Sequence, residues 1–330
     1  MTPYPWHTSL WRRICADVDH DRVPHALLLG GRAGFGKRRF ASALASYLLC
    51  SDRRDTAACG ECRSCLLFLA GSHPDYQLVT PPDDGKQITV DGIRDCLDFT
   101  SLSSGISRHK VVLMVPSEAM NRNAANALLK TLEEPTAGTI FLLVSDQPSA
   151  LLATIRSRCR RIALDQIDFT EAVTWVSSRL PEPGQAELAC ALAGGAPVVA
   201  AELDLPSAMA ELSAIISLLN AVAANERDAL LAIVEYANEH LGTSDVLVRL
   251  IETMIYKSRA IDAPFDAASH TQRRSDAVTS KLDIRSLLGI RELLMQQRRN
   301  AFAWSGLRER DRIEELFLTV SHLENRGMQA

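Results

Sequence analysis

The glycine-rich segment that begins at residue 31 constrains the fold more strongly than any other part of the chain. It follows an apolar run at residues 26–29, and apolar residues at helical spacing follow it over residues 40–49. The segment fits the phosphate-binding loop pattern G-x-x-x-x-G-K-[ST] at every position except the last. A strand, a loop whose backbone amides curl around phosphate, and a helix are therefore predicted. The glycines and the lysine of the segment are Gly31, Gly34, Gly36 and Lys37.

The last position of the pattern departs from it. A Ser or Thr there holds Mg²⁺ through its hydroxyl group, whereas this chain has Arg38. Arginine offers no metal ligand and carries a positive charge where the cation would sit. The loop is therefore predicted to be degenerate, with weak or no nucleotide binding and no turnover of ATP.

The first half of the chain alternates between strand-like and helical stretches. Apolar, β-rich runs at residues 26–29, 76–80, 111–115 and 140–144 are separated by helical patterns, as in a parallel sheet covered on both faces. The fold class predicted is a P-loop α/β domain over residues 1–165. A small helical lid over residues 166–207 and an all-helical domain over residues 208–330 are expected to follow.

The lid is predicted to contain helices at residues 169–180 and 185–203, separated by a segment rich in proline and glycine. Beyond Pro206, apolar residues recur at helical spacing, with a polar loop expected at residues 263–281. This last domain is expected to be a helical bundle.

Composition narrows the class of protein. Of 330 residues, 47% are hydrophobic and 23% charged, and the net charge of −4 argues against a strongly basic nucleic-acid-binding protein. No signal-peptide pattern and no membrane-spanning stretch are recognised. A cytoplasmic location is therefore expected.

Four of the eight cysteines are grouped in a way that indicates a metal site. They have the spacing C-x8-C-x2-C-x2-C, with Gly60 in the first tight turn. Four thiolates suit one tetrahedral, structural Zn²⁺, with no ligand position left for water. An iron–sulfur cluster and four free thiols are the alternatives, whereas Cys15, Cys96 and Cys190 are expected to be ordinary buried thiols. The predicted zinc ligands are Cys50, Cys59, Cys62 and Cys65.

Four stretches together resemble one known family. They are residues 24–28 (PHALL), the cysteine cluster, residues 126–135 (NALLKTLEEP) and residues 155–159 (IRSRC). With these stretches, residues 5–205 resemble the bacterial clamp-loader subunits of the AAA+ ATPase family. The resemblance is weak in the last domain, residues 208–330, for which it implies an oligomerisation role as the collar that holds a ring of subunits together.

The resemblance also shows which catalytic groups are missing. Active relatives end an apolar strand in Asp-Glu, and these positions fall on Val115 and Pro116 here. A lid arginine that touches the γ-phosphate in active relatives aligns with Pro197, and a polar strand-end position is kept as Ser145. Glu118 lies close enough in sequence to be weighed as a substitute carboxylate. The combined losses argue against hydrolysis.

One catalytic element is retained. Ser157, Arg158 and Cys159 match the family motif by which one subunit inserts an arginine finger into the ATP site of its neighbour. The alternative is that Arg158 is one of four solvated arginines in a basic turn. Arg156, Arg160 and Arg161 are expected to be surface or interface charges, and Cys159 to be packed and unreactive.

The resemblance therefore implies a non-hydrolysing subunit of the clamp loader of bacterial DNA polymerase III. Its expected partners are ATP-hydrolysing subunits of gamma/tau type and the delta subunit, with the sliding clamp and primed DNA reached through the complex. Two other functions are the alternatives. A competent AAA+ motor would need Ser or Thr at position 38 and Asp-Glu at positions 115–116, and a zinc-dependent nucleic-acid-binding module would need interleaved aromatic residues and a basic charge.

Overall fold

A computed structural model describes residues 2–82 and 87–210 of the chain. Two compact units are present, the first ending at Glu171 and the second beginning at Ala172. Each unit is described by itself.

The first unit is built on a five-stranded parallel sheet with the strand order β2-β3-β4-β1-β5. Four strands confirm the predicted α/β class, since they lie where the apolar runs indicated. The register of the central pair places Ala26 opposite Phe141 and Gly30 opposite Ser145, so both strands end at the same edge. The strands are β1 (Ala26–Gly30), β2 (Tyr76–Val79), β3 (Lys110–Met114), β4 (Thr139–Ser145) and β5 (Arg160–Ala163).

The fifth strand was not predicted, and it lies where the alternative interpretation of Arg158 placed a basic turn. Arg160 and Arg161 lie on β5, which pairs with β1 at one edge of the sheet. Their side chains are exposed, and Ile162 is the one buried residue of the strand. Exposed charges are common on edge strands, where they discourage pairing with other chains. The apolar signal of a buried strand is therefore missing from this segment.

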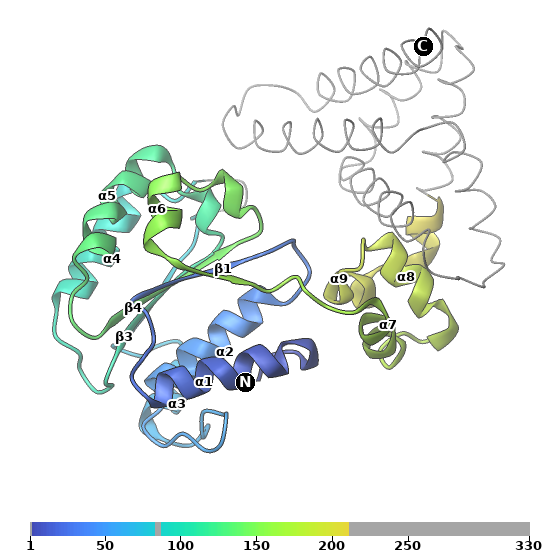
Figure 1. The fold of residues 1–330 in the computed structure, drawn as a ribbon, viewed down its shortest axis with the longest axis horizontal. Helices are drawn as coiled ribbons and strands as arrows, with labels where there is room; N and C mark the ends of the chain where they lie inside the picture. The colour runs from blue at the N-terminus through green and yellow to red at the C-terminus, as the bar shows by residue number, and fades with distance from the viewer. Residues whose placement is uncertain (1, 83–86, 211–330) are drawn as a thin grey trace, which may run out of the picture. The chain divides into compact units, whose positions relative to one another are not determined.

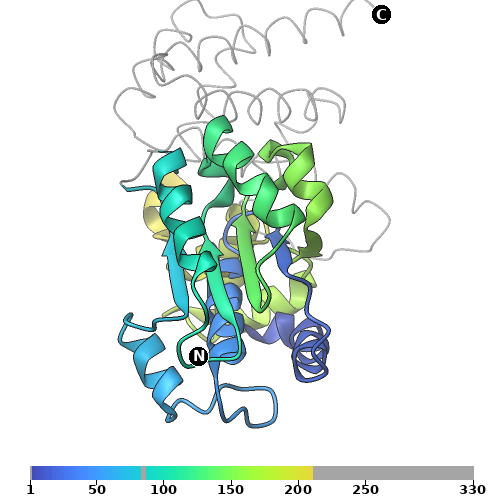
Figure 2. The ribbon, with the colours of Figure 1, turned by 90° about the vertical axis from the view of Figure 1, so that its left-hand side faces the viewer.

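Two hydrophobic cores cover the two faces of the sheet, because successive strand residues point to opposite sides. Leu27 and Leu29 of β1 pack into the core formed with α1 and α2, whereas Ala26 and Leu28 pack into the core formed with α4, α5 and α6. Figure 1 shows these two helical layers on either side of the strands, and Figure 2 shows the sheet between them from the side. The helices are α1 (Thr8–Asp19), α2 (Lys37–Leu49), α3 (Arg63–Leu69), α4 (Val90–Ser101), α5 (Arg122–Glu133) and α6 (Ala153–Arg158), and short 3-10 turns lie at Pro5–His7, Ser117–Ala119 and Pro148–Ala150.

A buried carboxylate fixes the loop that leads into β3. The side chain of Asp75 is fully buried, and it accepts hydrogen bonds from the backbone N–H groups of Gly105, Ile106 and Ser107 at 2.6–2.9 Å. Burial acts to raise the pKa of Asp75, but these three hydrogen bonds outweigh it and hold the pKa below its usual value. The ionised carboxylate therefore stabilises the folded domain.

We expect Asp75→Asn to lower the stability of the domain by about 2 kcal/mol or more at neutral pH, because the amide turns an N–H group toward buried donors. A carboxylate with a depressed pKa stabilises the fold above its unfolded pKa of about 3.9, and this contribution is lost as the pH falls through the lower folded value. Urea denaturation of both proteins at neutral and acid pH should therefore show the difference shrinking in acid. A constant difference would contradict the ionic role of Asp75.

The second unit is described to residue 210 and is helical there. The expected helix over residues 185–203 is in fact two helices, because Gly194 and Gly195 adopt positive φ values of 61° and 79° and Pro197 begins the next helix. Proline lacks the N–H group that a continuous helix requires, and it suits the first position of a new one. The elements are α7 (Phe169–Ser177), a 3-10 turn at Pro183–Gln185, α8 (Ala186–Leu192) and α9 (Pro197–Glu202).

The predicted C-terminal helical domain (residues 208–330) and its polar loop lie almost wholly outside the described residues, so they stay predictions. Within residues 2–82 and 87–210, no helix has the length and apolar character needed to cross a bilayer.

Candidate functional site

The glycine-rich loop joins β1 to α2, as the sequence predicted. Gly31, Gly34 and Gly36 have positive φ values of 142°, 81° and 83°, a backbone conformation that favours glycine. At two of these positions any larger residue would also clash with a neighbouring side chain. A Cβ atom on Gly31 would meet the Asp165 side chain, and one on Gly36 would meet the ring of Tyr4. The loop therefore has neighbours packed directly against its backbone.

Lys37 is the first residue of α2, and its side chain is only 3% exposed. Its Nζ atom donates to the carbonyl oxygen of Arg32 at 2.5 Å and forms an ion pair with Oδ1 of Asp146 at 2.5 Å. A buried ammonium group requires such partners, because burial of an unpaired charge is costly. In this structure the lysine expected to meet phosphate is paired within the chain.

Two acidic residues at the loop were missed by the sequence analysis. Asp146 directly follows β4, and Asp165 comes two residues after β5 and accepts a hydrogen bond from the backbone N–H of Arg32 at 3.1 Å. The carboxyl ends of parallel strands meet at one edge of a sheet, where ligands of α/β proteins bind. The sequence pattern that could have identified these two residues is an acidic residue placed one or two positions after the end of a strand, here β4 and β5.

The positions at which the resemblance implies metal-binding and water-activating groups do not carry them. Val115 and Pro116 follow β3 and offer no carboxylate, and Arg38 is exposed on the first turn of α2. The nearby carboxylate of Glu118 is engaged elsewhere: its Oε1 atom accepts from the backbone N–H groups of Asp146 and Gln147 at 2.8 and 3.2 Å. Burial raises the pKa of Glu118.

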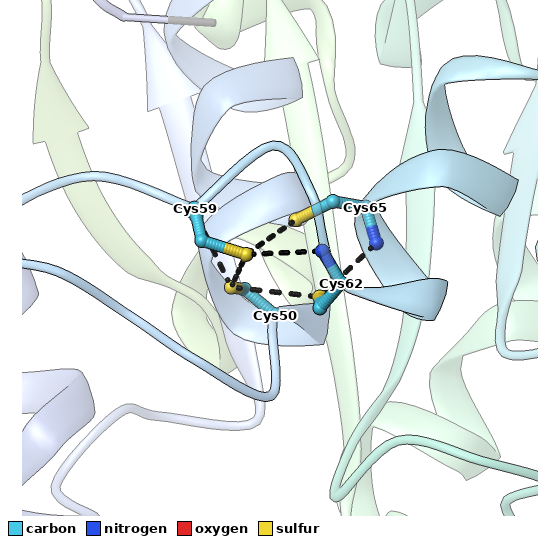
Figure 3. A group of neighbouring side chains, drawn as sticks. All are labelled: Cys50, Cys59, Cys62 and Cys65. Carbon is cyan, nitrogen blue, oxygen red and sulfur yellow. Dashed lines mark hydrogen bonds between the residues drawn. The ribbon is translucent and has the colours of Figure 1, made fainter.

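The four clustered cysteines come together at the end of α2 and the start of α3 (Figure 3). Their sulfur atoms lie within 4.8 Å of one another, and the pairs Cys50–Cys59, Cys59–Cys65 and Cys50–Cys62 are 3.7, 3.9 and 4.0 Å apart. These distances are far from the roughly 2.0 Å of a disulfide bond. All four are free thiols placed around one point.

The arrangement fits a single tetrahedral ion. Zinc–sulfur bonds of about 2.3 Å imply sulfur–sulfur edges of about 3.8 Å, close to the observed values. A multi-iron cluster needs room for several metal and sulfide atoms between its thiolates, which this spacing does not offer. Backbone N–H groups of Cys59, Cys62 and Cys65 point at sulfur atoms of Cys50, Cys59 and Cys62 at 3.2–3.4 Å, a contact that favours thiolates.

The cysteine-containing segment, residues 50–65, is tied to the α/β core in its middle and near its C-terminal end. The indole N–H of Trp11 donates to the carbonyl oxygen of Thr56 at 2.8 Å. On the other side, the hydroxyl of Ser64 lies 3.1 Å from that of Ser107, which in turn donates to the carbonyl oxygen of Leu49 at 3.0 Å. A change at the metal site would therefore be transmitted to the core.

Arg158 ends the short helix α6, and its side chain is one-third exposed. One guanidinium nitrogen donates to the carbonyl oxygen of Thr154 at 2.9 Å, and the other forms an ion pair with Glu133, the last residue of α5. Its neighbour Ser157 also donates to Thr154, at 3.0 Å. The guanidinium is thus oriented by two helices while part of it stays open to solvent.

The residues beside Arg158 have different environments. Cys159 is buried, which raises the pKa of its thiol to about 11, as expected for an unreactive cysteine. Arg160 contacts Asp17 at 3.3 Å, and Arg161 donates to the carbonyl oxygen of Arg156 at 3.4 Å. Cys15, Cys96 and Cys190 are buried, which confirms the expectation for them.

A parallel sheet with a glycine-rich loop and a buried lysine between its first strand and helix defines a P-loop-type α/β domain. A family model described as DNA polymerase III, delta subunit, matches residues 6–168. The DNA polymerase III subunit delta-prime of Pseudomonas aeruginosa is 46% identical over 202 residues, which cover 61% of this chain and 61% of that protein. The delta-prime subunit of Escherichia coli K12 is 38% identical over 204 residues, covering 62% and 61%.

Residues 6–168 of the chain therefore belong to the delta-prime family of DNA polymerase III subunits. The tau subunit of Escherichia coli K12 is 35% identical over 150 residues, covering 46% of this chain and 23% of that protein. The chain spans about 61% of the length of the two delta-prime relatives that it matches.

Proposed function

We propose that the chain is a non-hydrolysing subunit of the clamp loader of DNA polymerase III. The observation that carries the proposal is a contrast within one domain. Arg158 is retained and partly exposed at the end of α6, whereas Arg38, Val115 and Pro116 remove the chain's own metal-binding and water-activating groups. Such a domain is suited to assist hydrolysis at another subunit's site rather than to perform it.

The partners follow from the same proposal. Subunits of gamma/tau type would supply the ATP site that receives Arg158, and the delta subunit would contact the first domain. The assembly would load the sliding clamp onto primed DNA. The lid (residues 166–207) would follow the α/β domain, and the collar (residues 208–330) would hold the subunit in the ring.

The chemistry assigned to Arg158 is electrostatic. As ATP is hydrolysed, negative charge develops on the oxygens of the γ-phosphate, and a guanidinium group can meet two of them at once. The guanidinium acts through this charge alone and transfers no proton. Ser157 supports the segment through its hydrogen bond to Thr154, and Cys159 anchors it by burial.

A structural zinc ion is proposed for Cys50, Cys59, Cys62 and Cys65. A closed four-thiolate site leaves no position for water or substrate, so the ion would contribute to folding rather than to catalysis. It would fix residues 50–65, which lack a core of their own.

We predict that the purified chain does not hydrolyse ATP. Three groups needed for magnesium binding and water activation are replaced, at positions 38, 115 and 116. Phosphate release measured with and without Mg²⁺ should match the buffer background, and Lys37→Ala should change nothing. Magnesium-dependent turnover that Lys37→Ala abolishes would overturn this and would favour a competent AAA+ motor. ATP binding without turnover would leave the prediction standing.

A further inference from the structure

Lys37 is retained in a loop that keeps its glycines but has Arg38 in place of the metal-binding Ser or Thr, and its partner is a carboxylate of the same chain. We propose that Asp146 acts as an internal substitute for phosphate: it neutralises Lys37 and keeps a latent pyrophosphate-binding loop closed. On this proposal, the expected weak or absent nucleotide binding results from the pairing of Lys37 with Asp146 as well as from the missing metal site. The inference concerns the isolated chain and does not depend on the proposed role in clamp loading.

The burial of Lys37 makes a counter-charge necessary. Its ammonium group is almost inaccessible to water, and its two partners are the Arg32 carbonyl and Asp146. The carboxylate expected after β3 is replaced by Val115, so that strand offers no counter-ion. Asp146, after the neighbouring strand β4, supplies the charge instead.

The backbone around Asp146 is held in place independently of the ion pair. Oε1 of Glu118 accepts from the N–H groups of Asp146 and Gln147, and the hydroxyl of Ser145 accepts from the N–H of Gln147 at 3.1 Å. The turn that carries Asp146 is therefore preorganised. Its side chain is nevertheless 48% exposed, so an anion arriving from solvent could compete with it for Lys37.

Other groups close the rest of the loop. The carboxylate of Asp165 accepts a hydrogen bond from the backbone N–H of Arg32. This N–H group is one of those that would donate to a bound phosphate group. The ring of Tyr4 lies against Gly36, and it stacks on Trp6, whose indole N–H donates to the Phe35 carbonyl at 3.1 Å. Of the two acidic residues, Asp146 alone pairs with the lysine.

The test is pyrophosphate binding by Asp146→Asn, measured by calorimetry and by thermal shift without Mg²⁺. Asparagine keeps the size and a hydrogen-bonding oxygen but removes the charge. We expect the variant to be less stable than the wild type, and to bind pyrophosphate at least about tenfold more tightly. Asp146→Ser serves as a second variant if the asparagine protein folds poorly.

Two controls make the result specific. Asp165→Asn removes an equal charge from the same loop but leaves the lysine paired, so it should give little gain in affinity. Lys37→Met combined with Asp146→Asn should restore stability relative to Asp146→Asn and should not bind pyrophosphate.

Three results would overturn the inference. The wild type could bind pyrophosphate as tightly as Asp146→Asn, both neutral variants at position 146 could fail to bind it, or Asp165→Asn could give an equal gain. None of these results bears on Arg158, so they leave the proposed function to its own test.

Discussion

Replacement of Arg158 by alanine is expected to impair the assembled clamp loader severely while leaving this chain folded. Fingers of this kind contribute about 10³–10⁵ in rate in GTPases, so we expect hydrolysis at the one ATP site served by Arg158 to be nearly abolished. Other sites in the ring would keep their own fingers, and total ATPase activity should fall only in part. Clamp loading, which needs coordinated hydrolysis, should fall much further. The measurements are the clamp- and DNA-stimulated ATPase and the loading rate of the reconstituted complex.

The controls for this experiment are the stability of the Arg158→Ala protein and variants of the neighbouring arginines. The ion pair of Arg158 with Glu133 is partly exposed to solvent, and pairs at the protein surface contribute about 1 kcal/mol or less, so folding and assembly should be nearly unchanged. Arg158→Lys should behave almost like alanine, because an ammonium group cannot reproduce the bidentate geometry. Arg160→Ala and Arg161→Ala remove equal charges from the adjacent strand. If they were as damaging as Arg158→Ala, general electrostatics would explain the loss and the finger assignment would be wrong.

Loss of the metal ion is expected to have the largest effect on stability. Cys62→Ser removes one of four thiolate ligands, and loss of a metal belongs to the most destabilising class of changes, so we expect a cost of about 3–5 kcal/mol. For a domain of this size the thermal midpoint would fall by roughly 6–20 °C. A chelator should have a similar effect on the wild type. Differential scanning calorimetry with and without chelator measures both.

Elemental analysis identifies the ion directly. We expect one zinc per chain in protein purified without chelator, and less in Cys62→Ser. Cys96→Ser is a matched control, because this buried thiol lies in the core and outside the cluster. Iron in place of zinc, or no metal in a protein whose stability is insensitive to chelator, would contradict the assignment.

Several features could be predicted because they depend on residues close together in the sequence. The apolar runs predicted four of the five strands, since a strand buried on both faces needs a continuous apolar segment. The spacing of Cys59, Cys62 and Cys65 predicted a cluster, since tight turns bring such residues together. The glycines of the loop predicted a backbone that can curl around a phosphate group, and in the structure they adopt positive φ values. Strand β5 and the break near Gly194 were missed, because exposed arginines and an alanine-rich helical pattern concealed them.

The sequence by itself determined the α/β class, the loop between β1 and α2, and the grouping of the four cysteines. The tertiary structure alone decided the partners of the charged residues. Lys37 and Asp146 are 109 positions apart, and Arg158 and Glu133 lie on different helices; each pair meets only through the order of the strands and the packing of the helices. Local patterns are set by backbone geometry and apolar spacing, whereas a buried charge takes whichever counter-charge the completed fold places beside it.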